Sequence, residues 1–275
     1  MARNQIISLI FNGFEIGKLG YDEDKRKSSF QYNPDFLAQN NYKNLFPYVI
    51  RRVENVQIFT EFEGETFRGL PPMIADSLPD VFGNIIFKEW LEATNKTFAN
   101  ISPLEQLTYL GNRGMGALEF VPQKDLPLHT TINLQEISDT VLRVMDLKKT
   151  IAEKGLSDAA LLTTFKIGTS AGGARPKILM SEHKTTGELI PGDLVYSADY
   201  HHYLIKLGLD AHEGYSKEQV EFVYYQMATH CGIEMMPSKL IDNKHFATLR
   251  FDRQNGKKQH VLTASGLTGW DFKKP

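Results

Sequence analysis

The sequence is poor in several features that would point to a narrow class of protein. It has one cysteine, Cys231, in 275 residues, which excludes an intrachain disulfide framework and a cysteine-rich zinc site. No apolar run approaches the roughly 20 residues of a membrane-spanning helix, and the N-terminus lacks a basic-then-apolar signal. The formal net charge of -2 gives no general attraction to nucleic acid or membrane. We therefore expect a cytoplasmic protein that binds neither directly.

Composition predicts a folded chain of one or two domains. Apolar residues make up 41% of the chain and aromatic residues 11%, which is enough for sizeable cores. A stretch with few charges at residues 121–133 is the best boundary, so we expect an N-terminal part, 1–125, and a second part, 126–275. The eight histidines are scattered. His201 and His202 are adjacent, and on a strand they would face opposite ways, so they make a poor metal chelate.

Local patterns predict a mixed α+β fold, in which a small β-rich part with short helices precedes an antiparallel sheet with one main helix. Asn12-Gly13 is a hairpin signal within residues 4–20. Further strands are expected at 50–62, 117–121, 203–207, 236–241, 245–253 and 260–263. Helices are expected at 84–94, 103–110, 134–154 and 216–231. Ser216 and Gln219 resemble a capping box at the start of the last helix, whose apolar face comprises Val220, Val223, Tyr224, Met227 and Ala228.

Residues 165–177 form the most informative stretch. They contain Gly168, Gly172 and Gly173, the hydroxyls of Thr169 and Ser170, and the cations Arg175 and Lys177. Glycines let a backbone approach a ligand closely, and consecutive N–H groups bind anions. The loop lacks the Walker pattern, because Pro176 separates the two cations and an apolar run follows. Taken alone, the stretch fits a phosphate-holding loop or a glycine-rich hairpin that binds nothing.

A strand lysine and a helix glutamate follow this loop. Lys206 ends an apolar strand, and Glu221 lies in the first half of the next predicted helix. In protein kinases a strand lysine contacts the nucleotide phosphates, and a glutamate on the following helix orients it. The order of these elements favours a kinase-like phosphate site. The alternative is that both are ordinary surface residues.

Five collinear motifs resemble the family of HipA-type toxin kinases. They are residues 170–177 (SAGGARPK), 76–83 (DSLPDVFG), 115–120 (MGALEF), 203–206 (YLIK) and 250–253 (RFDR), the last followed by His260. The resemblance spans essentially the whole chain. It implies an N-terminal HipA subdomain over 1–125 and, over 126–275, a part similar to a kinase N-lobe that stops before the catalytic loop.

The resemblance also implies site residues and partners. Ser170 matches the serine that these kinases autophosphorylate to switch themselves off, Lys206 the ATP-phosphate lysine and Glu221 the helix glutamate. Residues 249–251 match the hinge, where backbone groups bind adenine. Expected partners are a HipB-like DNA-binding antitoxin and, as substrate in some members, glutamyl-tRNA synthetase, an aminoacyl-tRNA synthetase. The expected ATP-binding set is Gly168, Ser170, Gly172, Gly173, Lys206, Glu221, Arg250 and Phe251.

Residues 250–275 contain no arrangement that matches the family's catalytic base or its Mg²⁺ ligands. Asp271 has no partner acid after it. We therefore expect no catalytic and no metal-binding residue in this chain, ATP and Mg²⁺ as cofactors of a longer protein, and weak or no ATP binding here. A second hypothesis is a naturally truncated, non-enzymatic regulator that docks on an antitoxin or on a complete kinase. A third is a binding protein with a fortuitous glycine loop.

Overall fold

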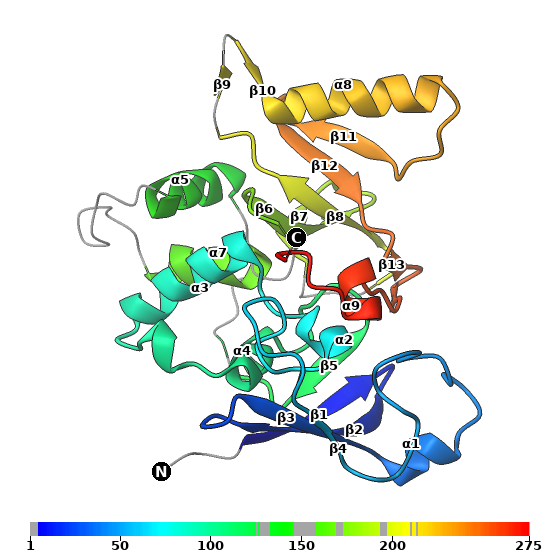
Figure 1. Ribbon diagram of the computed structural model, residues 1–275. Helices are drawn as coiled ribbons and strands as arrows, with labels where there is room; N and C mark the ends of the chain where they lie inside the picture. The colour runs from blue at the N-terminus through cyan, green and yellow to red at the C-terminus, as the bar shows by residue number, and fades with distance from the viewer. Residues whose placement is uncertain are drawn as a thin grey trace. The chain divides into compact units, whose positions relative to one another are not determined.

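A computed structural model describes residues 5–124, 126, 133–145, 158–168, 173–192, 197–209, 211–212 and 214–274 (Figure 1). The chain forms two compact units that interleave along the sequence. Unit 1 comprises Met1–Leu78, Ala99–Leu126 and Lys258–Pro275, and unit 2 comprises Pro79–Phe98 and Pro127–Lys257. The expected division into residues 1–125 and 126–275 stays a prediction, because contacts show where the chain packs and not which part folds alone.

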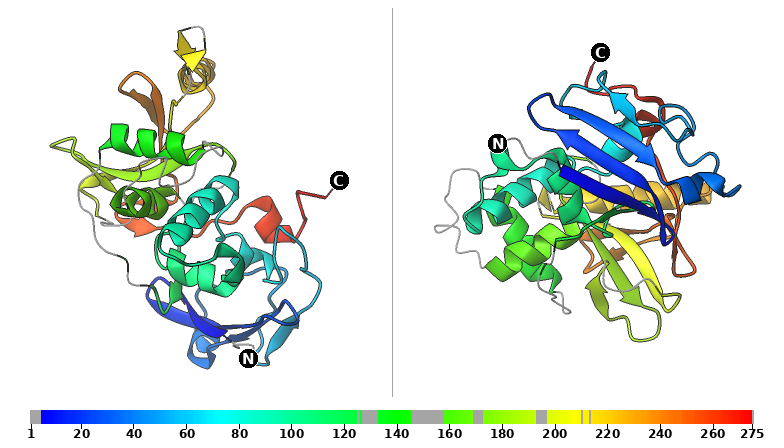
Figure 2. Two further views of the ribbon diagram at one scale, coloured as in Figure 1. Left: turned by 90° about the vertical axis from the view of Figure 1, so that its left-hand side faces the viewer. Right: turned by 90° about the horizontal axis from the view of Figure 1, so that it is seen from below.

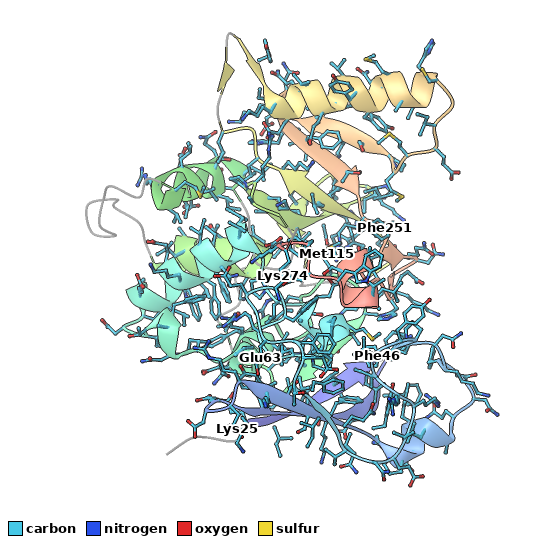
Figure 3. All side chains as sticks on the ribbon, viewed as in Figure 1. Lys25, Phe46, Glu63, Met115, Phe251 and Lys274 are labelled. Atoms are coloured by element: carbon cyan, nitrogen blue, oxygen red, sulfur yellow. The ribbon has the colours of Figure 1, made fainter. Side chains whose placement is uncertain are left out.

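Unit 1 is built on a five-stranded antiparallel sheet with the order β4-β3-β2-β1-β5. Asn12 and Gly13, both at positive φ, join β1 to β2, as the hairpin signal predicted. Alternate side chains, among them Leu9, Leu19 and Phe30, enter one core, which also contains Phe46 (Figure 3). The strands are β1 (Gln5–Phe11), β2 (Phe14–Asp22), β3 (Lys27–Tyr32), β4 (Gln57–Phe59) and β5 (Leu118–Val121).

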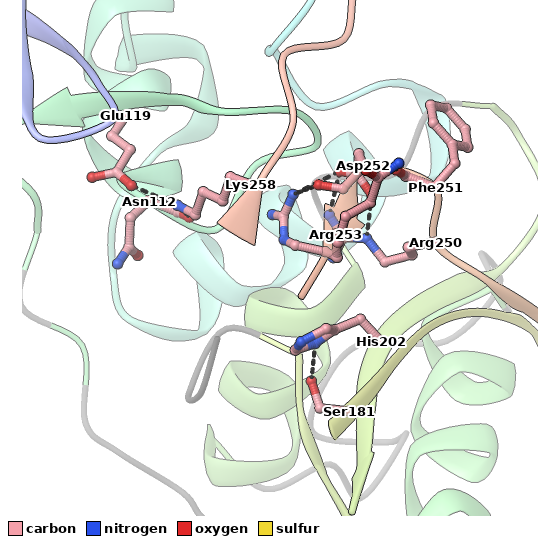
Figure 4. A network of polar contacts seen from close by, with 10 residues as sticks. Asn112, Glu119, Ser181, His202, Arg250, Phe251, Asp252, Arg253 and Lys258 are labelled. Atoms are coloured by element: carbon pink, nitrogen blue, oxygen red, sulfur yellow. Dashed lines mark hydrogen bonds and ion pairs between the residues drawn. The ribbon is translucent and has the colours of Figure 1, made fainter. Parts of the chain in front are cut away.

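Residues 258–274 belong to unit 1 and are fastened there by polar contacts. The helices of this unit are α1 (Pro34–Ala38), α2 (Pro72–Ala75), α4 (Pro103–Leu110) and α9 (Ala264–Thr268). The Asp76 carboxylate, just after α2, accepts hydrogen bonds from Thr263 N at 2.8 Å and Thr263 Oγ1 at 2.6 Å. A Cβ at Gly266 would lie 2.6 Å from Asp76 Cγ, so glycine is needed at this close approach. The Lys258 ammonium donates to Glu119 at 2.7 Å (Figure 4).

Unit 2 contains a second five-stranded antiparallel sheet, with the order β11-β12-β8-β6-β7. These strands are β6 (Lys177–His183), β7 (Leu189–Pro191), β8 (Tyr200–Lys206), β11 (Ser238–Ile241) and β12 (His245–Leu249). The main helix, α8 (Lys217–His230), lies between β8 and β11 in the chain and packs along β11 and β12 (Figures 1 and 2). Both hydrogen bonds of the predicted capping box of Ser216 and Gln219 are present. Short pairs are formed by β9 (Ala211–His212) with β10 (Tyr215–Ser216) and by β13 (Arg253–Gln254) with β14 (Lys257–Lys258).

Three helices of unit 2 pack on one another: α3 (Val81–Ala93), α5 (Leu134–Met145) and α7 (Asp158–Gly168). Trp90 of α3 stacks on Phe165 of α7, with ring centroids 4.6 Å apart. Phe87 stacks on the same ring at 4.9 Å. Because α7 also packs against β6, this aromatic stack joins the helices to the sheet. A short 3-10 turn, η1 (Phe98–Asn100), follows α3 in the chain.

The predicted α+β class with antiparallel sheets is confirmed, and several element boundaries were wrong. α3 begins at Val81 rather than Asn84, because the Asp80 side chain caps its first turn. Only Gln57–Phe59 of the predicted strand 50–62 pairs with a neighbour. Residues 260–263 form no strand, and Thr263 instead caps α9. The last part of the predicted helix 134–154 lies outside the described residues. In the described part of the chain, every helix is too short or too polar to cross a membrane.

Candidate functional site

Lys206 and Glu221 form an ion pair, as their order in the sequence predicted. The Lys206 Nζ lies 2.6 Å from Glu221 Oε1, which joins the end of β8 to the first half of α8. The two side chains are 27% and 35% exposed. The pair therefore fixes the ammonium in direction and leaves part of it open to a ligand. Its role in ATP binding stays a prediction.

A second lysine, Lys177, lies beside this pair. It is the cross-strand neighbour of Lys206 in the β6–β8 register, so both lysines are on one face of the sheet. Lys177 is only 5% exposed, and its Nζ has no hydrogen-bond partner among the described residues. Burial lowers its pKa, an effect that the Asp80 charge opposes and the Lys206 charge reinforces. A buried ammonium without an acceptor is costly, so an anion bound here would be stabilising.

Asp80 fastens the end of the glycine-rich loop to α3. One carboxylate oxygen accepts from the Val81 N–H at 2.7 Å, and the other accepts from the Gly173 N–H at 2.6 Å. The Gly173 carbonyl in turn accepts from the Phe82 N–H at 3.3 Å. Gly173 has φ +103°, a backbone conformation that residues other than glycine rarely adopt. A Cβ at this position would lie 3.1 Å from Lys177 Nζ. Gly173 is therefore fixed close to the buried Lys177 ammonium.

Arg175 adds a third cation to this group. Its Nη1 lies 3.8 Å from Glu218 Oε1, at the start of α8. Glu218 is nearly buried while the Arg175 side chain is half exposed, so the guanidinium is held near the loop with part of its surface free. Arg175, Lys177 and Lys206 place three cationic side chains near Gly173, in a group that also contains the carboxylates of Asp80, Glu218 and Glu221. Such a group is suited to phosphate.

The structure describes six of the eight predicted ATP-binding residues. Gly173, Lys206 and Glu221 take part in the group just described. Gly168 is buried as the last residue of α7. Ser170 and Gly172 lie outside the described residues, so the phosphorylation prediction for Ser170 is not addressed. Arg250 and Phe251 follow β12. Phe246 is the strand partner of Lys206. Arg250 comes four residues after Phe246, so the two backbone positions are about 13 Å apart along the strand direction.

The side chain of Arg250 is buried and forms an ion pair with Asp252. Its Nε and Nη2 donate to the two carboxylate oxygens of Asp252 at 2.9 and 2.7 Å (Figure 4). Arg253 Nη1 also donates to Asp252, at 2.8 Å. All three side chains are buried, with at most 2% exposure. The 250–253 motif thus contains a buried cluster in which one carboxylate forms ion pairs with two guanidinium groups.

Part of the predicted adenine hinge is already hydrogen-bonded. The Arg250 N–H donates to the His202 carbonyl at 2.8 Å, and the Leu249 N–H donates to the Pro237 carbonyl at 2.9 Å. The Phe251 carbonyl accepts from Gln254 Nε2 at 3.4 Å. Phe251 has a 51% exposed side chain (Figure 3). The role of residues 249–251 in binding adenine stays a prediction.

His202 lies near the cluster and is held neutral. Its Nδ1 is 2.8 Å from the Ser181 hydroxyl (Figure 4). Burial, together with the charges of Arg250 and Arg253, lowers the pKa of His202 to about 4, and burial is the largest of these causes. Among the described residues, no group of three or more His, Cys, Asp or Glu side chains is arranged to hold a metal ion.

The sequence did not predict a role for Asp80 or Asp252, and it did not predict that Lys177 is buried. Asp80 lay inside the 76–83 motif, and its place before an apolar helix was a signal for an N-cap. Lys177 was noted as a cation of the loop, but nothing local showed that it is buried. Asp252 lies close to two arginines in sequence, which hints at ion pairing but not at burial.

Comparisons with known proteins agree with the order of the motifs. A family model described as HipA N-terminal domain matches residues 7–121, and one described as HipA-like C-terminal domain matches residues 169–274. A comparison with curated proteins gave no match. Among solved structures, HipA of Shewanella oneidensis MR-1, in a toxin–antitoxin complex with HipB and operator DNA, is similar at 15% identity and a TM-score of 0.52.

This structural match shows the fold alone, because the identity is low. It covers 98% of this chain and 57% of the Shewanella chain, so this chain spans little more than half the length of that relative. The two family matches follow one another in the chain and together cover most of it. The chain therefore belongs to the HipA-type family.

Proposed function

We propose that this chain is the N-terminal portion of a HipA-type serine/threonine kinase and that unit 2 contains the part of its ATP site that holds the phosphates. One observation carries the proposal: the buried Lys177 ammonium has no partner among the described residues and lies beside Lys206. Phosphate oxygens would accept hydrogen bonds from this ammonium and balance its charge.

Each group has a distinct task in this proposal. Glu221 holds the Lys206 ammonium in a fixed direction, so that the lysine is already oriented toward the nucleotide phosphates before they bind. Asp80 holds Gly173 beside the same two lysines. Phosphorylation of Ser170 would add nearly two negative charges to a loop that must lie against phosphates, and their repulsion would displace the loop and switch the kinase off.

The chain by itself is proposed to be catalytically silent. Phosphoryl transfer needs a residue that accepts the substrate hydroxyl proton and ligands that place Mg²⁺, and residues 250–275 supply neither pattern. ATP binding by this chain is accordingly weak, since the cations described here hold only the phosphates. ATP with Mg²⁺ is the cofactor of the longer protein.

Binding is tested by backbone amide NMR of the deuterated full chain during titration with ATP to millimolar concentration. We expect signals of residues 173–178 to shift, and the shifts to vanish when Lys177→Met and Lys206→Met are combined. Lys217→Met, which removes an exposed cation of α8, is the matched control and should leave the titration unchanged. Absence of shifts in the wild type, or equal shifts in the double variant, would refute the phosphate site.

The proposed lack of kinase activity in this chain is tested separately with radiolabelled ATP and Mg²⁺. We expect no label on the chain, whereas a complete kinase of this family added in trans would label Ser170. Labelling by the chain alone, lost in Ser170→Ala, would show that this chain is a kinase by itself. Calorimetry with Mg-ATP should give little or no heat, and a micromolar dissociation constant would contradict the proposed weak binding.

A small DNA-binding antitoxin of the HipB type is the proposed partner, and an aminoacyl-tRNA synthetase is the proposed substrate of the longer protein. The support for the partner is the Shewanella structure, in which a HipA is complexed with HipB and operator DNA. Affinity purification of the tagged chain from its native cells tests this. Recovery of neither an antitoxin nor a kinase would contradict it.

A further inference from the structure

One side of α8 is apolar and exposed. Val220, Val223, Tyr224 and Met227 are 37%, 51%, 66% and 57% exposed. They follow one another at positions i, i+3, i+4 and i+7, which places them in a single stripe along the helix. We call these four residues the α8 stripe. We propose that the α8 stripe binds the α8 stripe of a second copy of the chain, with the two helices antiparallel.

The stripe lies on the side of α8 that is turned away from its own sheet. The opposite side packs against β11 and β12 and carries the buried Glu218 together with Glu221, the partner of Lys206. An amphipathic helix normally turns its apolar side inward. In α8 the less exposed side is mixed, since it carries these glutamates together with Phe222 and Tyr225, and the apolar stripe on the other side remains for a contact with another surface.

The stripe has the symmetry that a two-fold contact requires. Its spacing is the same when read in either direction about the midpoint between Val223 and Tyr224. In an antiparallel pair, Val220 of one copy meets Met227 of the other, and Val223 meets Tyr224, each contact occurring twice. Such an isologous interface needs a patch that is complementary to itself. Four apolar side chains of moderate size in a symmetric row meet that requirement.

Charges near the ends of the helix favour the antiparallel arrangement. Lys217 is exposed at the N-terminal end, and Glu234 is exposed shortly after the C-terminal end. An antiparallel pair brings Lys217 of each copy toward the C-terminal end of the other, where Glu234 and the helix dipole attract a cation. A parallel pair would instead bring the two lysines together. The charges therefore select one of the two directions.

The exposed apolar area of the α8 stripe sets the expected affinity of the dimer. The stripe, with the exposed Ile233 and Met235 that follow the helix, offers on the order of 500 Å² per copy, against about 800 Å² per partner in a standard stable interface. The pair should therefore be weak and reversible, with a dissociation constant on the order of tens of micromolar. This inference does not depend on the proposed ATP site.

Sedimentation equilibrium of the full chain over a wide concentration range tests the proposal. We expect a monomer–dimer equilibrium in the wild type and at least a tenfold weaker dimer in Tyr224→Lys. Gln226→Lys adds the same charge at an exposed position of the same helix outside the stripe, and should dimerise as the wild type does. Both positions are on the surface, so both variants should fold. A monomer at every concentration, or equal dimerisation of the two variants, would overturn the proposal.

Cysteine cross-linking tests the direction of the helices. With Cys231, the single native thiol, replaced by serine, Tyr224→Cys should form an intermolecular disulfide under mild oxidation, because this position lies next to the proposed two-fold axis. Gln226→Cys should cross-link much more slowly. Equal rates for both variants would show that dimers form without the proposed pairing and would overturn it.

Discussion

Replacing Asp252 by asparagine should destabilise the protein strongly. The change keeps the size of the side chain and removes the carboxylate charge that both Arg250 and Arg253 contact in the buried cluster. Guanidinium groups do not lose their protons in proteins, so both arginines stay charged. An asparagine amide also has only one oxygen, while the carboxylate uses both of its oxygens as acceptors.

The magnitude follows from the burial of the three side chains. Removing one partner of a buried ion pair costs about 3–5 kcal/mol, because an uncompensated charge is left in a medium of low polarity. For a chain of this size, each kcal/mol lowers the melting temperature by about 2–4 °C. We therefore expect Asp252→Asn to lower it by on the order of 10 °C.

Thermal unfolding followed by circular dichroism measures this shift. Asp242→Asn is the matched control, since Asp242 is an exposed acid of unit 2 at positive φ, a conformation that asparagine also tolerates. We expect the control to melt within about 2 °C of the wild type. If Asp252→Asn also melts within that range, the cluster is not a major source of stability and the reasoning fails.

Three further predictions concern other parts of the chain. The pKa of His202 is about 4 in the folded protein, below its ordinary value, so the unfolded chain takes up a proton first as the pH falls. The free energy of unfolding should therefore fall by up to about 3 kcal/mol between about pH 6.5 and pH 4. Urea unfolding at both ends of this range should show a smaller fall in His202→Asn than in the wild type. Gly173→Ala should cost about 1–2 kcal/mol through its positive φ, seen as a lower urea midpoint than that of the wild type. Asp76→Ala removes both acceptors of Thr263, and hydrogen exchange should show faster opening of α9 with little change in α8.

The sequence alone determined the features that depend on near neighbours. Asn12-Gly13 marked the first hairpin, and Ser216 with Gln219 marked the start of α8, because turns and caps are set by residues within a few positions of each other. The order of the glycine-rich loop, Lys206 and Glu221 also favoured an ion pair, by analogy with the lysine and glutamate of protein kinases, but it left open that both are ordinary surface residues.

Only the tertiary structure decided which polar groups are buried and what they meet. Asp80 binds Gly173, which is 93 positions away, and Asp76 binds Thr263, which is 187 positions away. Periodicity gave α8 an apolar stripe but could not say which side faces the sheet, because that depends on the contacts that the other side, with Glu218, Glu221, Phe222 and Tyr225, makes in the folded chain. The isolation of Lys177 and the burial of Asp252 arise in the same way: the register of β6, β8 and β12 sets their surroundings, and no local signal encodes it.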